Sequence, residues 1–382
     1  MRPLDGIRVI EFCSVAAGPF CAMLLADMGA DVIKVENPDG GDSMRQWPPL
    51  NQGYSENFAS LNRNKRSVTL DLKEARDNRR ARDLIRSAQA VIENNRPGVM
   101  QRLNLDYQTV SADDPQLVYC SISAFGQSGA RSREAGFDLT LQAMSGIMSV
   151  TGEAGQAPVK CGVPVSDFST GLYGAFAIAS ALFHVRAGGS GTHIDASMLG
   201  ASLAVSALQT SEYFGSGRNP ARLGSAHPRN APYQALRAKD GYFAMAAGNN
   251  ALYRSACAAI NRLDLFEDPR FASTALRAKN QSALLPILEL EFSSYTCSDL
   301  LARFRAWGVP CSPINTYSDA LADPQVEAMG WVHTLSLPPG VQTRTFGSPL
   351  RFSDQDFPIY RRPQSLGEHN TEVFAEIEAA QA

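Results

Sequence analysis

The amino-acid sequence predicts an α/β fold built on a parallel sheet. In the first half of the chain, short apolar segments rich in β-branched residues alternate with segments of helical periodicity. Strands that are joined through helices run parallel and carry those helices on the faces of the sheet. A similar alternation resumes after Gly215–Pro220, so the 382 residues are expected to form one large and one smaller α/β domain.

The first elements of the large domain follow one another closely. Ile7–Phe12 is apolar and β-rich, Pro19–Met28 has Pro in the first turn of a helix, and Asp31–Val35 is the next strand candidate. No Gly-x-Gly-x-x-Gly motif follows the first strand, so the sequence does not support a nicotinamide-binding site. The later elements are three expected strands, Ser67–Leu70, Ala90–Glu93 and Leu117–Ser121, and one expected helix, Glu74–Ala88.

The second half of the chain begins with the linker candidate Gly215–Pro220, in which Gly and Pro favour a break. A Pro-rich extended segment, Pro338–Pro363, precedes a last helix from Thr371. We therefore expect a large domain over residues 1–214, a small domain with its linkers over 215–330, and a C-terminal segment over 331–382. The elements expected in the small domain are strands Tyr233–Ala238 and Tyr242–Ala246 and helices Ala251–Ile260, Ser282–Phe292 and Ser298–Trp307.

Composition limits the class of protein. The chain is 44% hydrophobic and 19% charged, and its net charge of −3 offers no basic footprint for nucleic acid or an anionic membrane. Its 7 Cys lack Cys-x-x-Cys spacing and its 5 His lack metal-binding spacing, so neither a metal site nor a disulfide framework is expected. The N-terminus has no signal peptide, and the longest apolar stretch, Leu172–Phe183, is too short to cross a bilayer. A soluble, cytoplasmic protein is expected.

Asp167 is the most informative single residue. It lies in the segment Gly162–Gly171, directly before the apolar stretch Leu172–Phe183, which is long enough for a helix of about three turns. Free N–H groups and the positive end of the helix dipole stabilise a carboxylate at such a position. The simpler interpretation is that Asp167 only caps the helix.

Short motifs mark the chain from end to end. Leu4–Phe12 is followed by Ala17-Gly18-Pro19 and by Leu25–Glu36, and a Leu-Gly-Glu-His motif ends at His369. In their order and spacing these motifs, with the Asp167 segment, resemble the class III (CaiB/BaiF-type) CoA-transferase family, which includes formyl-CoA transferase and the carnitine CoA-transferases. The resemblance also includes Gly41-Asp42, Asn62–Ser67, Leu70–Lys73, Glu93–Gly98 and Ser123–Gly129.

The resemblance implies a role for Asp167 and an architecture. In this family the matching Asp is the nucleophile that attacks an acyl-CoA thioester, so Asp167 is expected to do the same. Acyl-CoA and an organic acid are then substrates, and no tightly bound cofactor is required. The resemblance further implies a large Rossmann-like domain, a smaller α/β domain, a C-terminal segment that packs back on the large domain, and an interlocked, ring-shaped homodimer.

The resemblance also implies CoA contacts, carried over position by position. A CoA site needs cations for the phosphates and apolar walls for adenine and pantetheine, and Lys73 and Arg102 suit the charged part. Their simpler interpretation is a solvated helix face. Asn37 and Ala135 stand where formyl-CoA transferase has basic residues, which changes the expected phosphate contacts. The expected CoA-binding residues are Val15, Ala16, Leu70, Lys73, Asn94, Asn95, Arg102 and Met198.

The segment Arg222–His227, with Pro158-Val159-Lys160, resembles succinyl-CoA–glutarate CoA-transferase. The second carboxylate of a short diacid needs a partner, and the candidates are Lys160, Arg222, His227 and Arg229. Each could equally be a surface residue, and His227 an ordinary loop histidine. The family has a Gly-containing loop that moves over the active site, which would include Gly248 here, although Gly and Asn also suit an ordinary turn.

The expected function is CoA transfer from an acyl-CoA, with succinyl-CoA as the expected donor, to a short diacid such as itaconate, glutarate or a substituted succinate. Three alternatives stay open: a monocarboxylic or formyl/oxalate-like acceptor, an acyl-CoA racemase, and a non-catalytic CoA-binding scaffold. Racemases of the family place His at the position of Phe137, and Phe cannot carry a proton. Phe137 could also be a core aromatic. Ser128 lacks the Gly-x-Ser-x-Gly context of a serine hydrolase.

Overall fold

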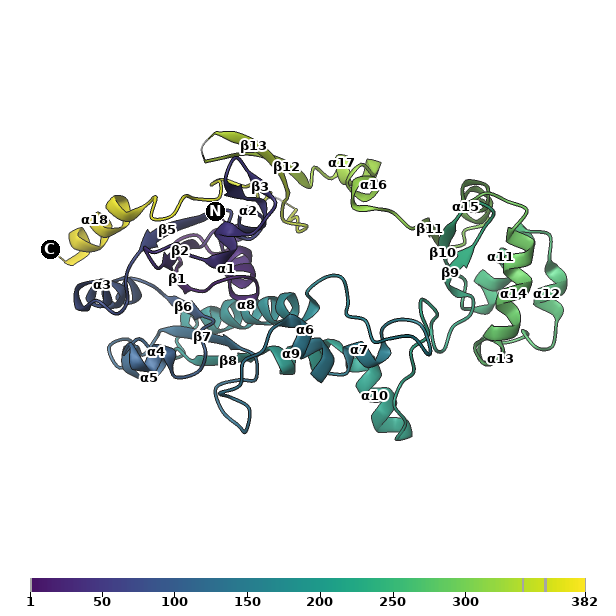
Figure 1. The fold of residues 1–382 in the computed structure, drawn as a ribbon, viewed down its shortest axis with the longest axis horizontal. Helices are drawn as coiled ribbons and strands as arrows, with labels where there is room; N and C mark the ends of the chain where they lie inside the picture. The colour runs from purple at the N-terminus through teal and green to yellow at the C-terminus, as the bar shows by residue number, and fades with distance from the viewer. Residues whose placement is uncertain (1, 339, 354–355, 382) are drawn as a thin grey trace. The chain divides into compact units, whose positions relative to one another are not determined.

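Figure 1 shows the computed structural model, which describes residues 2–338, 340–353 and 356–381. The chain divides into two compact units. Unit 1 contains Met1–Ile147, Lys160–Gly217 and Pro324–Ala382, and unit 2 contains Met148–Val159 and Arg218–Asp323. Two separate segments of the chain therefore form unit 2, and the shorter one, Met148–Val159, precedes Asp167 in the sequence.

Unit 1 is built on a six-stranded sheet with the order β5-β2-β1-β6-β7-β8, in which every neighbouring pair is parallel. The order is that of doubly wound nucleotide-binding sheets, and it confirms the predicted parallel sheet. The chain reverses its direction of winding between β1 and β6, and ligands of such folds bind outside the carboxyl ends of the strands at this point. The strands are β1 (Arg8–Phe12), β2 (Asp31–Glu36), β5 (Lys65–Thr69), β6 (Ala90–Glu93), β7 (Val118–Ser123) and β8 (His193–Ser197).

Helices cover both faces of this sheet (Figure 1). On one face, Ile10, Ile33 and Val91 pack against α3, α4, α5 and the C-terminal α18. On the other face, Val9 and Ile92 pack against α1 and α8. Burial on both faces explains why the central strands β1 and β6 are largely apolar. The helices are α1 (Ala17–Asp27), α3 (Ala75–Arg86), α4 (Val99–Arg102), α5 (Tyr107–Val110), α8 (Val165–Arg186) and α18 (Asn370–Gln381).

Helix α8 is longer than the sequence predicts. It begins at Val165 and has 22 residues, whereas the apolar pattern predicted about three turns from Leu172. Within the described residues, α8 is long and apolar enough to cross a membrane, and a third of its most apolar stretch is buried. Its Gly171 and Gly174 allow it to pack closely along α1, as expected of a helix in one of the two helical layers that cover the sheet.

The C-terminal segment returns to unit 1. Strands β12 (Val332–Leu337) and β13 (Val341–Phe346) form an antiparallel hairpin, so part of the segment predicted to be extended is paired. Val373 and Ile377 of α18 join the core over β5, where Arg66 forms ion pairs with Glu372 and Glu376. The other elements of unit 1 are η1 (Ser43–Gln46), β3 (Leu50–Asn51), β4 (Tyr54–Ser55), α2 (Glu56–Leu61), α6 (Asp138–Met144), α9 (Met198–Val205), α10 (Ala207–Ser216) and α17 (Pro324–Ala328), and α7 (Ile147–Val150) begins at its border.

Unit 2 has its own core. A three-stranded antiparallel sheet, ordered β11-β10-β9, packs against helices through Phe243, Phe292 and Phe304, whose rings lie 5.6 to 5.9 Å apart. Gly215 and Ser216 of the predicted linker complete α10, so the break begins at Gly217. The elements are β9 (Tyr233–Arg237), β10 (Tyr242–Ala246), β11 (Cys311–Pro313), α11 (Asn250–Ala259), α12 (Leu263–Glu267), α13 (Thr274–Lys279), α14 (Gln281–Phe292), α15 (Cys297–Ala306) and α16 (Tyr317–Leu321).

Candidate active site

Asp167 is the third residue of α8 and lies in its first turn. Pro164 occupies the cap position, and no side chain caps the helix. The interpretation of Asp167 as an N-cap is therefore wrong, because the helix begins two residues before it. The free N–H groups of the first turn and the dipole of a 22-residue helix favour a negative charge here.

Burial acts on Asp167 in the opposite direction. The side chain is partly buried, and this burial, with a smaller contribution from the Asp138 carboxylate, raises the pKa of Asp167 to about 7. Both causes disfavour the charged form. A carboxylate that is ionised near neutral pH and poorly solvated is well suited to attack a carbonyl carbon.

Asp138, at the start of α6, supports this turn and was not singled out from the sequence. Its Oδ1 accepts a hydrogen bond from Ser166 N at 3.0 Å, and its Oδ2 accepts one from Gln142 Nε2 at 2.7 Å. Gln142 is fully buried, and its Oε1 accepts from Cys161 N at 2.9 Å. Hydrogen bonds therefore connect α6 to Cys161, before Gly162, and to Ser166, after it, in the segment that leads into α8.

Phe137 precedes this carboxylate. Its side chain is 73% exposed, so the alternative interpretation of Phe137 as a core aromatic is wrong. It occupies the cap position of α6, where its backbone N–H donates to Thr140 Oγ1 at 3.0 Å. The ring is therefore exposed on the surface of unit 1.

The N-termini of α1 and α8 lie at the same end of the sheet. A Cβ on Gly171 would lie 2.8 Å from Ala17 O, and the rings of Phe20 and Phe168 are 4.7 Å apart. Phe168 also shares an apolar cluster with Val15 and Ala16, in the loop that follows β1. The start of α8, with Asp167, therefore packs beside this loop.

The loop from Ser14 to Ala16 is held by polar contacts. Val15 has a φ of +69°, a left-handed conformation that is strained for a β-branched residue. Asp42 Oδ1 accepts a hydrogen bond from Val15 N at 3.0 Å. On the other side, Asn94 accepts from Ser14 N at 2.9 Å and donates to Ser14 O at 2.8 Å. Such strain persists only where the surrounding contacts determine the backbone.

A buried ionic cluster anchors these contacts. Lys34 and Glu11 are both fully buried, and Lys34 Nζ lies 3.0 Å from Glu11 Oε1, 3.0 Å from Asp42 Oδ2 and 2.7 Å from Cys13 O. Lys65 Nζ lies 2.9 Å from Glu11 Oε2. Burial alone would lower the pKa of Lys34, but the neighbouring carboxylates hold it above its ordinary value, so Lys34 is charged. Removal of one partner would leave an uncompensated buried charge.

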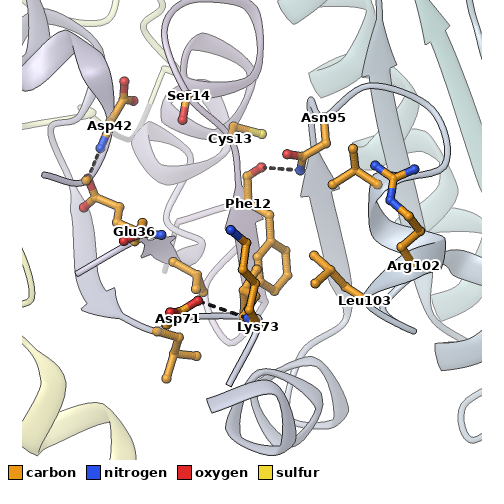
Figure 2. Close-up of a pocket in the computed structure, with 16 residues that line it drawn as sticks. Phe12, Cys13, Ser14, Glu36, Asp42, Asp71, Lys73, Asn95, Arg102 and Leu103 are labelled. Carbon is orange, nitrogen blue, oxygen red and sulfur yellow. Dashed lines mark hydrogen bonds between the residues drawn. The ribbon is translucent and has the colours of Figure 1, made fainter. Parts of the chain in front are cut away.

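A cavity of about 440 Å³ opens at the carboxyl ends of β1, β2, β5 and β6, where the winding of the sheet reverses (Figure 2). Lys73 and Arg102 lie on either side of Phe12 in this view. Among the described residues, neither cation forms an ion pair with a carboxylate, whereas the Glu36 carboxylate of the cavity is paired with Arg45. Phe12, Leu70, Leu72, Val99 and Leu103 supply apolar lining.

The structure brings most of the predicted CoA-binding residues to this region. Leu70, Lys73, Asn95 and Arg102 line the cavity, and Asn37, one of the positions without the expected basic residue, lines it too. Val15 and Ala16 belong to the adjoining Ser14–Ala16 loop, and Asn94 forms hydrogen bonds with Ser14 of that loop. Met198 is buried at the start of α9, outside the lining of this cavity, and Ala135 is an exposed residue elsewhere in unit 1.

The predicted diacid-binding residues divide between the units. Lys160, in unit 1, donates through Nζ to Cys161 O at 3.1 Å. In unit 2, Arg222 donates to Gln156 O at 2.6 Å, and His227 and Arg229 belong to a turn before β9. Gly248 follows β10, and a Cβ there would lie 2.5 Å from Asn230 Cβ, so this position requires Gly.

Arg277 is a residue of unit 2 that sequence reasoning missed. Its guanidinium is fully buried and donates to Gly248 O at 2.9 Å and to Ala231 O at 2.8 Å. Nothing in the local sequence distinguishes it from the exposed Arg residues of other helices, because its acceptors lie 29 and 46 residues away. Over the described ranges, no group of three or more His, Cys, Asp or Glu is placed to hold a metal ion.

Comparison with known proteins agrees with this geometry. The model of CoA-transferase family III matches residues 4–370. A succinate–glutarate CoA-transferase of Agrobacterium fabrum is 40% identical over 98% of this chain and 96% of its own, and a succinyl-CoA:glutarate CoA-transferase of Mus musculus is 34% identical over 99% and 87%. A crystal structure of a CAIB/BAIF family protein from Brucella suis matches with a TM-score of 0.87 and 40% identity, covering 98% of this chain and 99% of that one. The chain is therefore an enzyme that belongs to CoA-transferase family III.

Proposed function

We propose that this enzyme transfers CoA from succinyl-CoA to a short dicarboxylic acid, such as glutarate or itaconate, with Asp167 as the nucleophile. The observation that carries the proposal is the partly buried Asp167 carboxylate in the first turn of α8, packed beside the loop that borders the cavity of unit 1. The relatives from Agrobacterium fabrum and Mus musculus, both named for glutarate, support a diacid acceptor.

The cavity suits CoA in size and chemistry. About 440 Å³ lies within the range of small-molecule sites, and Lys73 and Arg102, which form no ion pair with any described carboxylate, supply cations for phosphate groups. Phe12 and Leu103 offer apolar surface for the adenine or the pantetheine arm. The thioester then reaches Asp167 across the Ser14–Ala16 loop, whose strained backbone is held by Asp42 and Asn94.

The reaction begins with attack on the thioester. An Asp167 oxygen forms a bond to the succinyl carbonyl carbon, the C–S bond breaks, and CoA leaves as a thiolate. The product is a mixed anhydride between succinate and Asp167. The thiolate then attacks the aspartyl carbonyl, which releases succinate and leaves an aspartyl-CoA thioester.

The second half repeats these steps in reverse. A carboxylate oxygen of the acceptor acid attacks the aspartyl-CoA carbonyl and expels the thiolate. The thiolate then attacks the acyl carbonyl of the new anhydride, which gives the acceptor's CoA ester and restores the Asp167 carboxylate. Each thioester or anhydride retains the energy of the donor, provided that water is excluded from the site.

Other reactions of the same fold are less consistent with these residues. A monocarboxylic acceptor has no distal carboxylate, and oxalate has its second carboxylate bonded directly to the first. Neither acid matches the longer diacid for which these two relatives are named. Racemisation needs a second proton carrier near the Asp, and the exposed Phe137 beside Asp138 cannot serve as one.

The proposal includes an interlocked homodimer in the cytoplasm. The apolar residues Leu172, Phe176 and Phe183 of α8 are 54%, 71% and 75% exposed, and Phe214 of α10 is 82% exposed. Apolar surface of this extent needs a cover, and a second copy of the chain is the cover that we propose. The seven free Cys residues fit a reducing compartment.

A screen of acids tests the proposed function. Purified enzyme is incubated with succinyl-CoA and, one at a time, glutarate, itaconate, mesaconate, oxalate, valerate and carnitine, and new CoA esters are measured by mass spectrometry. We expect the fastest turnover with a diacid of four or five carbons. With succinyl-CoA and hydroxylamine, the wild type should acquire a hydroxamate on Asp167.

The matched variant is Asp167→Ala, which should retain its fold and lose both exchange and hydroxamate formation. Full turnover by a folded Asp167→Ala enzyme would sink the proposed nucleophile. Turnover restricted to valerate or carnitine would instead refute the diacid assignment.

A further inference from the structure

The residue before Asp167 is fixed through each of its polar groups. Ser166 is fully buried, and its N–H is one of the groups at the start of α8 that have no acceptor within the helix. Asp138 of α6 accepts from this N–H at 3.0 Å, a role that a capping side chain usually has and that no cap residue takes here. Ser202 Oγ of α9 donates to Ser166 Oγ at 2.8 Å, and Thr170 Oγ1 donates to Ser166 O at 2.6 Å. The backbone from which the Asp167 side chain starts is therefore held by both α6 and α9.

Gln142 determines where the Asp138 carboxylate points. The two residues are four positions apart on α6, so their side chains lie on the same face of the helix. Gln142 Nε2 donates to Asp138 Oδ2 at 2.7 Å, and Gln142 Oε1 accepts from Cys161 N at 2.9 Å. A backbone N–H can only donate, so Cys161 fixes which end of the amide faces Asp138. With Gln142 on Oδ2 and Ser166 N on Oδ1, both oxygens of the carboxylate are occupied.

The position of Gln142 excludes a direct contact with a substrate. Its side chain is fully buried, and it does not line the cavity of unit 1. Gln142 and the residues to which it is linked, Asp138, Cys161 and Ser166, all belong to unit 1. Loss of its amide would free one oxygen of the partly buried Asp138 carboxylate, and this side chain could then rotate away from Ser166 N. Any effect of Gln142 on the reaction therefore passes through Asp138 and the start of α8.

We propose that Gln142 is a positioning residue for CoA transfer: it holds Asp138 against the start of α8 and so keeps the Asp167 carboxylate in the orientation from which it attacks the thioester. The inference rests on the proposed function and deepens it, because it takes Asp167 as the nucleophile. A displacement of about 1 Å in a reacting group can lower a rate on the order of a hundredfold. CoA binding should not depend on Gln142, since the residues that line the cavity keep their own contacts.

A removal and an exchange of polarity test this role. Gln142→Met keeps the length of the side chain and loses both hydrogen bonds. Gln142→Glu keeps an acceptor for Cys161 N but places a second carboxylate against that of Asp138. The further change Asp138→Asn restores the hydrogen bond with its direction reversed, because the amide introduced at position 138 donates to the carboxylate introduced at position 142. The oxygen of the introduced amide can still accept from Ser166 N.

The measurement is the rate of hydroxamate formation on Asp167 at saturating succinyl-CoA, per mole of folded enzyme. Gln142→Met and Gln142→Glu should each lower this rate about 10- to 100-fold, while the dissociation constant of free CoA stays at its wild-type value. The double variant Asp138→Asn/Gln142→Glu should be faster than Gln142→Glu alone, which a double-mutant cycle expresses as coupling between the two positions.

Leu182→Ala is the control for stability. Leu182 is buried in the core of unit 1 and lies on α8, roughly 22 Å along the helix from Asp167. Its truncation leaves a cavity and should lower the unfolding temperature without reaching the start of the helix. The control should therefore keep the wild-type rate of hydroxamate formation per mole of folded enzyme.

The outcomes are distinct. A wild-type rate in Gln142→Met would overturn the role of Gln142 and leave the proposed function intact. A wild-type enzyme that forms no hydroxamate on Asp167 would contradict the proposed nucleophile, and the inference with it. A double variant that recovers neither rate nor folding relative to Gln142→Glu would also overturn the inference, including when Gln142→Met does not fold. An equal loss of rate in Leu182→Ala would show that destabilisation alone explains the effect, and would overturn the inference as well.

Discussion

At the scale of single residues, Asp167 combines two opposing influences. The helix N-terminus favours its charged form, and burial with the nearby Asp138 disfavours it, with burial the larger effect. A carboxylate in water would be ionised at neutral pH but well solvated and weakly nucleophilic. The folded chain therefore gives up some stability to keep a less solvated carboxylate at this position.

This cost predicts a pH-dependent gain of stability in Asp167→Asn. The folded chain holds the Asp167 proton up to about pH 7, whereas the unfolded chain releases it near the ordinary value of about 4. Stability of the wild type is therefore lost as pH rises from about 4 to 7, and the variant avoids this loss. Thermal unfolding of ligand-free protein should show Asp167→Asn more stable at pH 8, on the order of a few degrees, and equal to the wild type near pH 3.5.

Asp42→Asn is the control of opposite sign. Burial would raise the pKa of Asp42, but Lys34 and the N–H groups of Met44 and Val15 outweigh burial and hold it below its ordinary value. The charged form stabilises the fold above about pH 4, so Asp42→Asn should be less stable than the wild type at pH 8. Equal unfolding temperatures of Asp167→Asn and the wild type at pH 8 would show that burial of Asp167 does not govern its ionisation.

At the scale of elements, the crossing of α1 and α8 determines where Asp167, the proposed nucleophile, lies. Gly171 and Gly174 let the two helix backbones approach, and a Cβ on Gly171 would lie 2.8 Å from Ala17 O and 2.9 Å from Phe20 Cδ1. Backbone cannot move aside as a flexible side chain can. Since both helices begin at the active-site end of the sheet, a change in their separation would move Asp167 relative to the Ser14–Ala16 loop.

Gly171→Ala should therefore reduce both stability and turnover. Overpacking of this kind costs about 1–3 kcal/mol, and displacement of the proposed nucleophile, Asp167, should lower kcat more than it raises KM for the CoA donor. Gly215→Ala is the matched control, because that glycine lies within α10 and nothing lies within 4 Å of the added methyl group. The control should gain about 0.5–1 kcal/mol from helix propensity. A Gly171→Ala enzyme with wild-type kcat and stability would refute the constraint at the crossing.

The sequence was sufficient for strands β1, β2 and β6 because their residues are almost all buried. Ala90–Glu93 was predicted with its observed bounds, and β1 and β2 to within one residue. The start of β5 was missed, since Lys65 and Arg66 do not look like strand residues. Their charges are balanced by Glu11 and by Glu376 of α18, partners far away in sequence that no local pattern reveals.

In the candidate site, too, residues that belong to a local sequence pattern could be predicted, and residues whose contacts are distant in sequence could not. Asp167 could be singled out because its motif is continuous in sequence, and its catalytic role stays a prediction. The start of its helix was predicted too late, at Leu172 instead of Val165. The predicted helix began after Gly171, and this glycine lies within α8 because Ala17 and Phe20 of α1 pack against it. Arg277 could not be found, because its function depends on carbonyl groups that only folding brings together.

At the scale of the whole molecule, the exposed apolar surface of unit 1 is the feature that the single chain leaves unexplained. Phe176, Phe183 and Phe214 project from α8 and α10, and Leu208 is 63% exposed on α10 as well. Monomeric proteins rarely expose contiguous apolar surface of this kind. A homodimer that covers it would bury far more than the roughly 1,600 Å² of a standard interface if the two chains interlock.

Such a dimer should be obligate, which gives a prediction at this scale. Dilution to nanomolar concentration should leave a species of twice 41.2 kDa by mass photometry, because folding and assembly would be one process. Phe176→Glu places a charge within the apolar face of α8 and should lower the dimer fraction, the yield of folded protein, or both. A stable and active species of 41.2 kDa at nanomolar concentration would show that neither an interlocked ring nor a covered α8 is needed for CoA transfer.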